Sequence, residues 1–94
     1  MRFVYYDKKK KSIDVEVCDN FIKKSVGLMF KKNSQPLLFV EDKEKIISIH
    51  SFFCKPFEAI WLDKNKKVTK KVIVKKWLPY ISGKGKYLLE IPLN

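Results

Sequence analysis

Apolar residues in this chain come in short runs that alternate with charged residues or stop at them, and this spacing constrains the fold most. Between Ile13 and Val17, every second residue is β-branched and the residues between are acidic, which is the period of a strand with one buried face. Other short apolar runs are bounded by charged or turn-forming residues. The pattern predicts strands over residues 3–6, 12–17, 37–40, 46–53, 57–62, 68–74 and 87–91.

One segment has the signals of a helix. Asp19 is a suitable N-cap, and Gly27 stands where a helix ends in the left-handed conformation, so we expect a short helix near residues 19–26. No second helix is available to build parallel crossover units. The sequence therefore predicts a mostly-β (α+β) fold: one compact, barrel-like antiparallel sheet of about seven short strands with one short helix. We expect residues 1–94 to form a single domain.

The composition excludes several classes of protein. No apolar run approaches the roughly 20 residues that a membrane-spanning helix needs, and the start of the chain lacks the pattern of a secretory signal. We therefore expect a cytoplasmic protein without a membrane partner. In that compartment, Cys18 and Cys54 are expected to be free thiols, because two cysteines are too few for a disulfide framework.

Three motifs in order resemble a known family. They are Gly27-Leu28-Met29-Phe30 after the expected helix, Phe52-Phe53 leading into Pro56-Phe57-Glu58-Ala59-Ile60-Trp61-Leu62-Asp63, and Tyr87-Leu88-Leu89-Glu90-Ile91-Pro92. Together they resemble the domain-of-unknown-function family 192 of prokaryotes. The resemblance implies a compact, mostly-β domain with one short helix and implies no activity. The sequence departs from the family pattern at Glu58, where aspartate is usual, and in the short Cys54-Lys55 segment before Pro56.

Glu58 is the best single candidate for acid–base chemistry. Apolar residues occupy both faces of its predicted strand, and desolvation would raise the pKa of a buried carboxyl. A structural carboxylate, bonded to backbone amides or to a lysine, is the favoured alternative. A small-ligand pocket around this acid would consist of Met29, Phe53, Cys54, Pro56 and Glu58.

Metal or nucleophilic chemistry has little support. His50 and Cys54 share a strand face, yet no close ligand spacing accompanies them, and no third group is identifiable to orient them. The sequence also lacks a phosphate-cradling glycine loop and a dinucleotide fingerprint. We therefore expect no metal, no cofactor and no catalytic residue.

The charge distribution is the main anomaly. The formal net charge is +11, and no acidic residue lies between Asp63 and Glu90. With aromatic residues interleaved, this interval suits phosphate contacts and base stacking. A solvated face that keeps the domain soluble is the alternative reading. The candidate anion-binding residues are Lys66, Lys67, Lys70, Lys71, Lys75, Lys76, Lys84 and Lys86.

Three functions remain open from the sequence. The first is a non-enzymatic binding module whose lysine-rich face takes an anionic partner such as RNA; lysine without arginine favours phosphate contacts over base readout. The second is a small enzyme or small-ligand-binding protein with Glu58 in a pocket. The third is a structural or protein-interaction domain.

Overall fold

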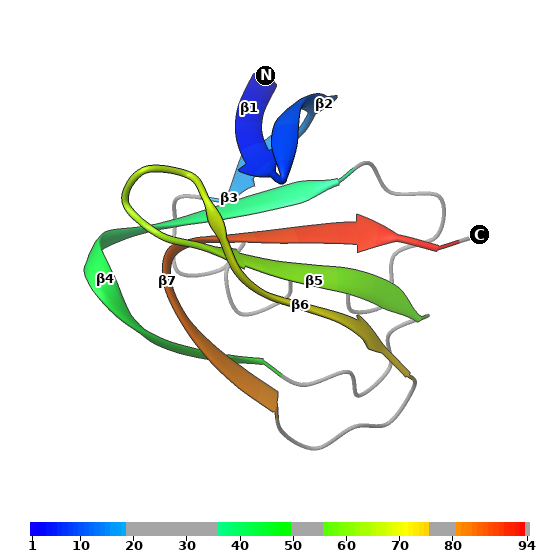
Figure 1. The fold of residues 1–94 in the computed structure, drawn as a ribbon. Coiled ribbons are helices and arrows are strands. Elements are labelled where there is room, and N and C mark those ends of the chain that lie inside the picture. The colour runs from blue at the N-terminus through cyan, green and yellow to red at the C-terminus, as the bar shows by residue number, and fades with distance from the viewer. Residues whose placement is uncertain (19–35, 50–55, 76–80, 94) are drawn as a thin grey trace.

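The computed structural model describes residues 1–18, 36–49, 56–75 and 81–93 (Figure 1). Within these ranges lie seven strands: β1 (Arg2–Asp7), β2 (Lys9–Asp14), β3 (Glu16–Cys18), β4 (Leu37–Ile49), β5 (Phe57–Leu62), β6 (Val68–Val74) and β7 (Ile81–Pro92). The mostly-β prediction is confirmed. The strands form a two-stranded sheet, β1-β2, and a five-stranded sheet in the order β3-β4-β7-β5-β6, so the predicted single barrel-like sheet is not what these residues form. The helix expected near residues 19–26 lies outside the described residues.

The N-terminal hairpin is tighter than its charged sequence suggests. Strands β1 and β2 pair from Arg2 opposite Asp14 to Asp7 opposite Lys9, which leaves Lys8 alone at the tip. Lys8 has a backbone φ of 66°, in the left-handed region that lets the chain reverse over so few residues. Residues 7–11, which separate the predicted strands 3–6 and 12–17, are therefore mostly strand, because alternate residues of β1 can pack on the larger sheet while the lysines stay outside.

Strands β4 and β7 are longer than the sequence indicates. The run over residues 37–40 and the described part of the second predicted strand, 46–49, belong to one strand, interrupted by a register shift between Val40 and Lys45. Strand β7 begins at Ile81 and not near residue 87 as predicted, so Gly83 and Gly85 lie within it. A Cβ at Gly85 would lie 2.6 Å from the carbonyl oxygen of Leu62, so glycine is needed there for close backbone approach.

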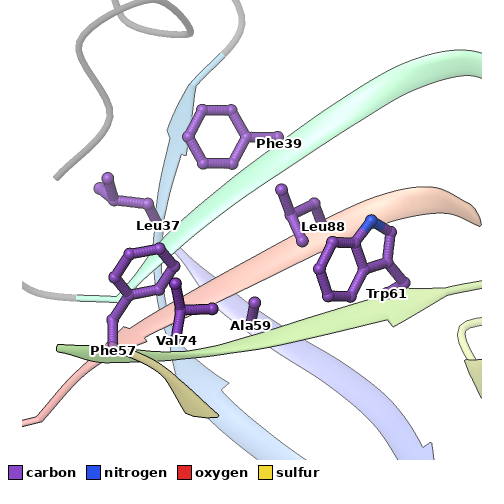
Figure 2. Packing of buried hydrophobic residues seen from close by; sticks show 7 residues of the cluster. All are labelled: Leu37, Phe39, Phe57, Ala59, Trp61, Val74 and Leu88. Carbon is purple, nitrogen blue, oxygen red and sulfur yellow. The ribbon is translucent and has the colours of Figure 1, made fainter. Parts of the chain in front are cut away.

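The five-stranded sheet has an apolar cluster on each face. One face, which we call the Trp61 face, carries a cluster whose members alternate along the strands, and Figure 2 shows them pointing into a common core: Leu37, Phe39, Phe57, Ala59, Trp61, Val74 and Leu88. The hairpin face carries the intervening residues of β4, β5 and β7 together with residues from the first eighteen: Phe3, Tyr5, Val15, Leu38, Ile60, Leu62 and Leu89. Burial on both faces explains why every residue of β5 except Glu58 is apolar.

Beyond the register shift, the second half of β4 pairs with the first half of β7, and both bend away from the other strands (Figure 1). Ile47, Ile49 and Ile81 from these halves pack against the cluster of the Trp61 face. Trp61, fully buried, donates a hydrogen bond from Nε1 to the carbonyl oxygen of Ile47 at 2.9 Å. The indole thus holds the bent half of β4 to the C-terminal end of β5, so that this half covers part of the Trp61 face.

Candidate anion-binding surface

The turn between β5 and β6 is organised by one carboxylate. Asp63 accepts hydrogen bonds at Oδ1 from the backbone amides of Asn65 (2.8 Å) and Lys67 (3.0 Å). Such bonds from a side chain to the amides that follow it are typical of aspartate in turns. Lys66 completes the turn with a φ of 65°, the second left-handed lysine among the described residues. The negative charge of Asp63 is therefore directed into the turn, while lysines occupy its outer part.

This turn lies beside the tip of the N-terminal hairpin. The backbone amide of Tyr6 donates to the carbonyl oxygen of Lys66 at 2.9 Å, and Tyr6 forms a parallel β-bridge with Lys67. Two lysine-rich segments some sixty positions apart in sequence thereby become neighbours. Between them is a hollow lined by Tyr6, Asp7, Lys8, Lys67 and Val68. We call residues 6–9 and 64–68 together the two-turn surface.

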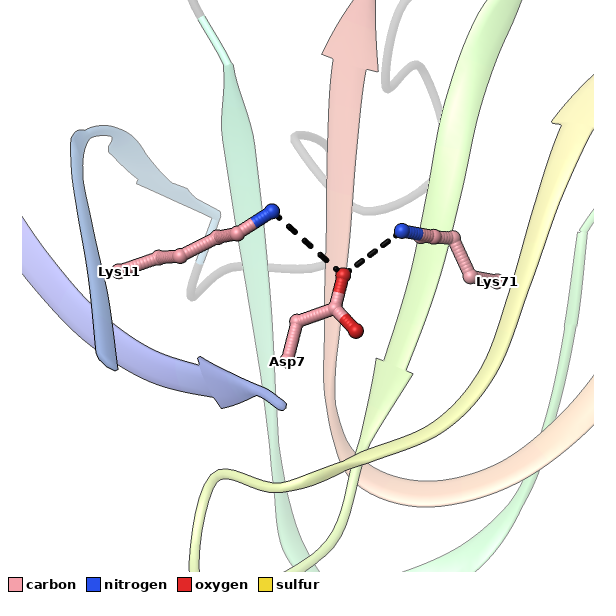
Figure 3. A network of polar contacts seen from close by, with 3 residues as sticks. All are labelled: Asp7, Lys11 and Lys71. Atoms are coloured by element: carbon pink, nitrogen blue, oxygen red, sulfur yellow. Dashed lines mark hydrogen bonds and ion pairs between the residues drawn. The ribbon is translucent and has the colours of Figure 1, made fainter. Parts of the chain in front are cut away.

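An ion-pair network joins the hairpin to the sheet (Figure 3). The Asp7 carboxylate lies 2.7 Å from Nζ of Lys71 on β6 and 3.6 Å from Nζ of Lys11 on β2, and Figure 3 shows both ammonium groups converging on the same oxygen. The hydrogen bond from Lys71 holds the pKa of Asp7 below its usual value, and the same contact raises the pKa of Lys71. Asp7 therefore stays ionised, and two lysines offset its charge beside the hollow.

The predicted lysines of β6 lie on opposite faces of the sheet. Lys70 stands opposite Trp61 and Lys71 opposite Ile60, and these two partners belong to different faces. The Lys70 ammonium donates to the carbonyl oxygen of Ser82 and lies 5.5 Å from the centre of the Trp61 ring system. Lys70 and Lys71 are thus both engaged within the protein, so they are less available to a partner than the pattern of β6 suggests.

The remaining candidate lysines have varied surroundings. Lys66 lies over the ring of Phe3 at 5.5 Å and Lys86 over the ring of Tyr87 at 5.4 Å, contacts that stabilise an ammonium while leaving its outer side in water. Lys67, Lys75 and Lys84 are exposed, and Lys75 has an interaction partner in the protein. Lys76 lies outside the described residues.

Sequence reasoning missed Lys8 as a candidate, because it counted lysines only after Asp63. The signal was present in the unbroken basic run Lys8-Lys9-Lys10-Lys11. A run of basic residues, however, contains no information on which distant segment of the chain lies next to it. The backbone contacts of Tyr6 with Lys66 and Lys67 show that the tip of the hairpin extends the basic surface of the second half.

The predicted pocket is described only in part. Met29, Phe53 and Cys54 lie outside the described residues, and Pro56 is half-buried at the start of β5. Glu58 is half-buried on the hairpin face, with Ile73 and Ile91 opposite it on the adjacent strands. Its charge acts on Tyr5, whose pKa is raised first by burial and then by Glu58. Of the five predicted pocket residues, only Pro56 and Glu58 lie within the described part of the chain.

Glu90 is the acid that the sequence analysis overlooked. It lies in the central strand β7, between Leu37 and Ala59, and only 5% of its surface is exposed. Burial raises the pKa of its carboxyl from 4.5 to about 8. The available signal was its place in the apolar run Leu88-Leu89-Glu90-Ile91, where a charged residue conflicts with its neighbours. A carboxyl in this setting is protonated at neutral pH.

Among the described residues, no three histidine, cysteine or acidic side chains form a group that could hold a metal ion. Within the same part of the chain, no helix is long and apolar enough to cross a membrane.

Comparison with known proteins gives the family. Residues 4–94 match the model of domain-of-unknown-function family 192, described as "Uncharacterized ACR", and the chain belongs to this family. The UPF0127 protein of Pyrococcus horikoshii is 39% identical over 83 residues, which cover 84% of this chain and 72% of that protein. The UPF0127 protein of Pyrococcus furiosus is 38% identical over 84 residues, covering 85% and 72%. The resemblance inferred from the three motifs is confirmed.

Solved structures support the fold alone. A protein of Sinorhizobium meliloti 1021, named as a candidate transcription regulator, superposes with a TM-score of 0.79 at 14% identity, covering 96% of this chain and 76% of that one. A protein of unknown function from Novosphingobium aromaticivorans gives a TM-score of 0.77 at 16% identity, covering 94% and 69%.

Proposed function

We propose that this domain is a non-enzymatic binding module that takes single-stranded RNA on the two-turn surface. The observation that carries the proposal is the contact between two lysine-rich turns that lie far apart in the sequence, made through Tyr6 and the backbone of Lys66 and Lys67. A chain with a net charge of +11 attracts polyanions over its whole surface. The two turns concentrate this attraction, because they bring lysines from separate segments to one surface.

The acidic groups near this surface have partners within the protein that reduce their electrostatic repulsion of an anion. Asp7 is compensated by Lys71 and Lys11, and Asp63 accepts two backbone amides of its own turn. Glu44 of β4 accepts the backbone amide of Lys64 at 2.8 Å through Oε2. The lysine side chains of the turns therefore dominate the local field.

The residue types favour a single strand bound without sequence selection. Lysine is a compact point charge that lacks the bidentate fork with which arginine recognises guanine, so the surface suits phosphates. Tyr6 is 43% exposed beside the lysines and offers a flat ring to an unpaired base. An unstacked RNA strand presents both groups together.

A salt titration tests the proposal. Each phosphate contact with a single strand contributes about −0.7 to the slope of log K against log salt, so three contacts predict roughly 20-fold weaker binding at about 200 mM than at about 50 mM salt. The measurement is fluorescence anisotropy of a labelled oligouridylate with the full chain. Absence of binding at the lower salt concentration would exclude the proposed function.

The two other functions left open by the sequence gain less from the structure. The small-ligand pocket depends on Met29, Phe53 and Cys54, which lie outside the described residues. A protein-interaction surface has support in two exposed isoleucines, Ile46 at 63% and Ile73 at 51% exposure. They come from β4 and β6, strands that do not neighbour one another in the sheet.

A further inference from the structure

We propose that the hollow in the two-turn surface holds one nucleotide of the bound strand, with its phosphate between Lys8 and Lys67 and its base against Tyr6. This inference rests on the proposed function and makes it specific. It assigns the hollow to a defined chemical unit, a phosphate diester linked to an unpaired base. The other lysines then act through the general field of the surface.

The hollow has a suitable size and lining. Its volume is about 530 Å³, within the range of about 300–1,000 Å³ that small-molecule sites occupy. Of its five lining residues, two carry ammonium groups, one a phenol and one a short aliphatic side chain. Lys8 contributes from the hairpin and Lys67 from the β5–β6 turn, so an anion in the hollow contacts both turns.

The fifth lining residue is an acid, and its position matters. The Asp7 carboxylate would repel a phosphate if it were uncompensated. Lys71 and Lys11 contact its Oδ2 at 2.7 and 3.6 Å, and together they carry one more charge than the aspartate. The group formed by these three residues is thus positive, and with Lys8 and Lys67 it leaves the hollow with an excess of cationic charge.

The backbone at both tips supports a role for the lysines. Lys8 and Lys66 adopt φ values of 66° and 65°, where glycine or asparagine is less strained. Lysine at both tips therefore has a conformational cost that the fold does not require. Strain of this kind at a surface turn is consistent with selection for the side chain.

Tyr6 is positioned by the alternation of β1. Phe3 and Tyr5 are buried in the hairpin face at 3% and 5% exposure, so the next residue along the strand is directed away from that core. Tyr6 is consequently available as a stacking platform at the wall of the hollow. Its backbone is fixed by the hydrogen bond to Lys66, which joins the platform to the turn that carries Lys67.

The test compares two variants of equal charge. Lys8→Asn/Lys67→Gln removes the two lysines that line the hollow, and Lys10→Gln/Lys64→Gln removes one neighbouring lysine from each of the same two segments. Thermal melting of both establishes that they fold. We expect the first variant to bind labelled oligouridylate about tenfold more weakly than the second at low salt, because it alone loses a phosphate contact. Equal losses in the two variants would overturn the inference while leaving the proposed function intact.

Two further measurements separate the phosphate from the base. Tyr6→Ala should weaken oligouridylate binding about tenfold, the effect of losing one stacked base, and Tyr6→Phe should restore most of it. Inorganic phosphate alone should shift the backbone amide resonances of Lys8 and Lys67 more than those of Lys10 and Lys64. Unchanged affinity in Tyr6→Ala would refute the stacking part of the inference. Phosphate-induced shifts without any binding of oligouridylate would overturn both the inference and the proposed function.

Discussion

The two-turn surface and the Trp61 face place charge in opposite settings. On the two-turn surface, many lysines surround a few acids, and water screens each interaction, so a single ion pair there contributes little to folding. On the Trp61 face, Glu90 lies among Leu37, Ala59 and other apolar side chains, where an ionised carboxyl is strongly disfavoured. One region tolerates changes of charge, and the other does not.

This difference separates the determinants of stability from those of the proposed binding. Residues of the Trp61 face should control unfolding and leave RNA affinity unchanged in the folded protein. Lysines of the two turns should control affinity with little effect on unfolding. Variants that violate this division would contradict the comparison.

Ionisation of Glu90 should give the largest effect. Because burial raises its folded pKa to about 8 from 4.5, the folded state binds this proton more tightly than the unfolded state. The free energy of unfolding should therefore fall as pH rises from about 4.5 to about 8, by at most about 5 kcal/mol at about 1.4 kcal/mol per pKa unit. Urea unfolding across this range measures it. Glu90→Gln should remove this component, and identical pH profiles for the two proteins would contradict the assignment.

Removal of the Trp61 side chain should be the next largest effect. Trp61 is fully buried and bonded to the carbonyl oxygen of Ile47, so Trp61→Ala leaves a cavity and releases the bent half of β4. We expect a loss of about 3–5 kcal/mol in the free energy of unfolding. The control Ile73→Ala, at an exposed position of β6, should change it by less than about 0.5 kcal/mol. Similar losses in both variants would show that the Trp61 face is not the main core.

Lys8→Asn should affect stability and binding in opposite directions. Asparagine tolerates positive φ better than lysine, so the variant should gain up to about 1 kcal/mol in the free energy of unfolding while it loses affinity for oligouridylate. Lys10→Asn, which lies within β2, should show no such gain. A loss of stability in Lys8→Asn would indicate that the lysine side chain supports the fold itself.

Asp7→Asn should have the smallest effect on folding. The pKa of Asp7 is lowered, chiefly by Lys71, so its contribution to stability is present above the unfolded pKa and is lost as pH falls through the folded pKa. Near neutral pH we expect a small drop in melting temperature that salt diminishes. RNA affinity should rise about threefold, because Lys71 and Lys11 are released toward the hollow. The control is Asp14→Asn, whose partner Arg2 lies at the other end of the hairpin, and it should not raise the affinity as much.

The sequence predicted those parts of the fold that follow from local period. The hairpin of β5 and β6 has the strand bounds expected, because alternation and the Asp63 turn define both. The length of β7 was missed, because Gly83 and Gly85 resemble loop residues unless one knows that the side chain of Trp61 and the backbone of Leu62 approach them. Local pattern contains no information on such contacts.

The same limit applies to the candidate site. Lysines after Asp63 were visible as a run of charge, but their pairing with Ser82 and Asp7 depends on which strands become neighbours. The position of Lys8 at the candidate site likewise depends on the contact between the hairpin tip and the β5–β6 turn, which the local sequence does not encode. Glu58 was singled out because both faces of its strand are apolar, and Glu90 was overlooked, although it occupies the central strand of the sheet and is the more buried acid.

Mapping of the bound strand on the protein tests the central claim most directly. Isotope-labelled full chain is titrated with oligouridylate at low salt, and backbone amide resonances are followed by NMR. The account predicts that the largest shifts occur at residues 6–9 and 64–68 and reverse when salt is raised to about 200 mM. Shifts concentrated around Glu90 and the Trp61 face, or spread evenly over all exposed lysines, would contradict it.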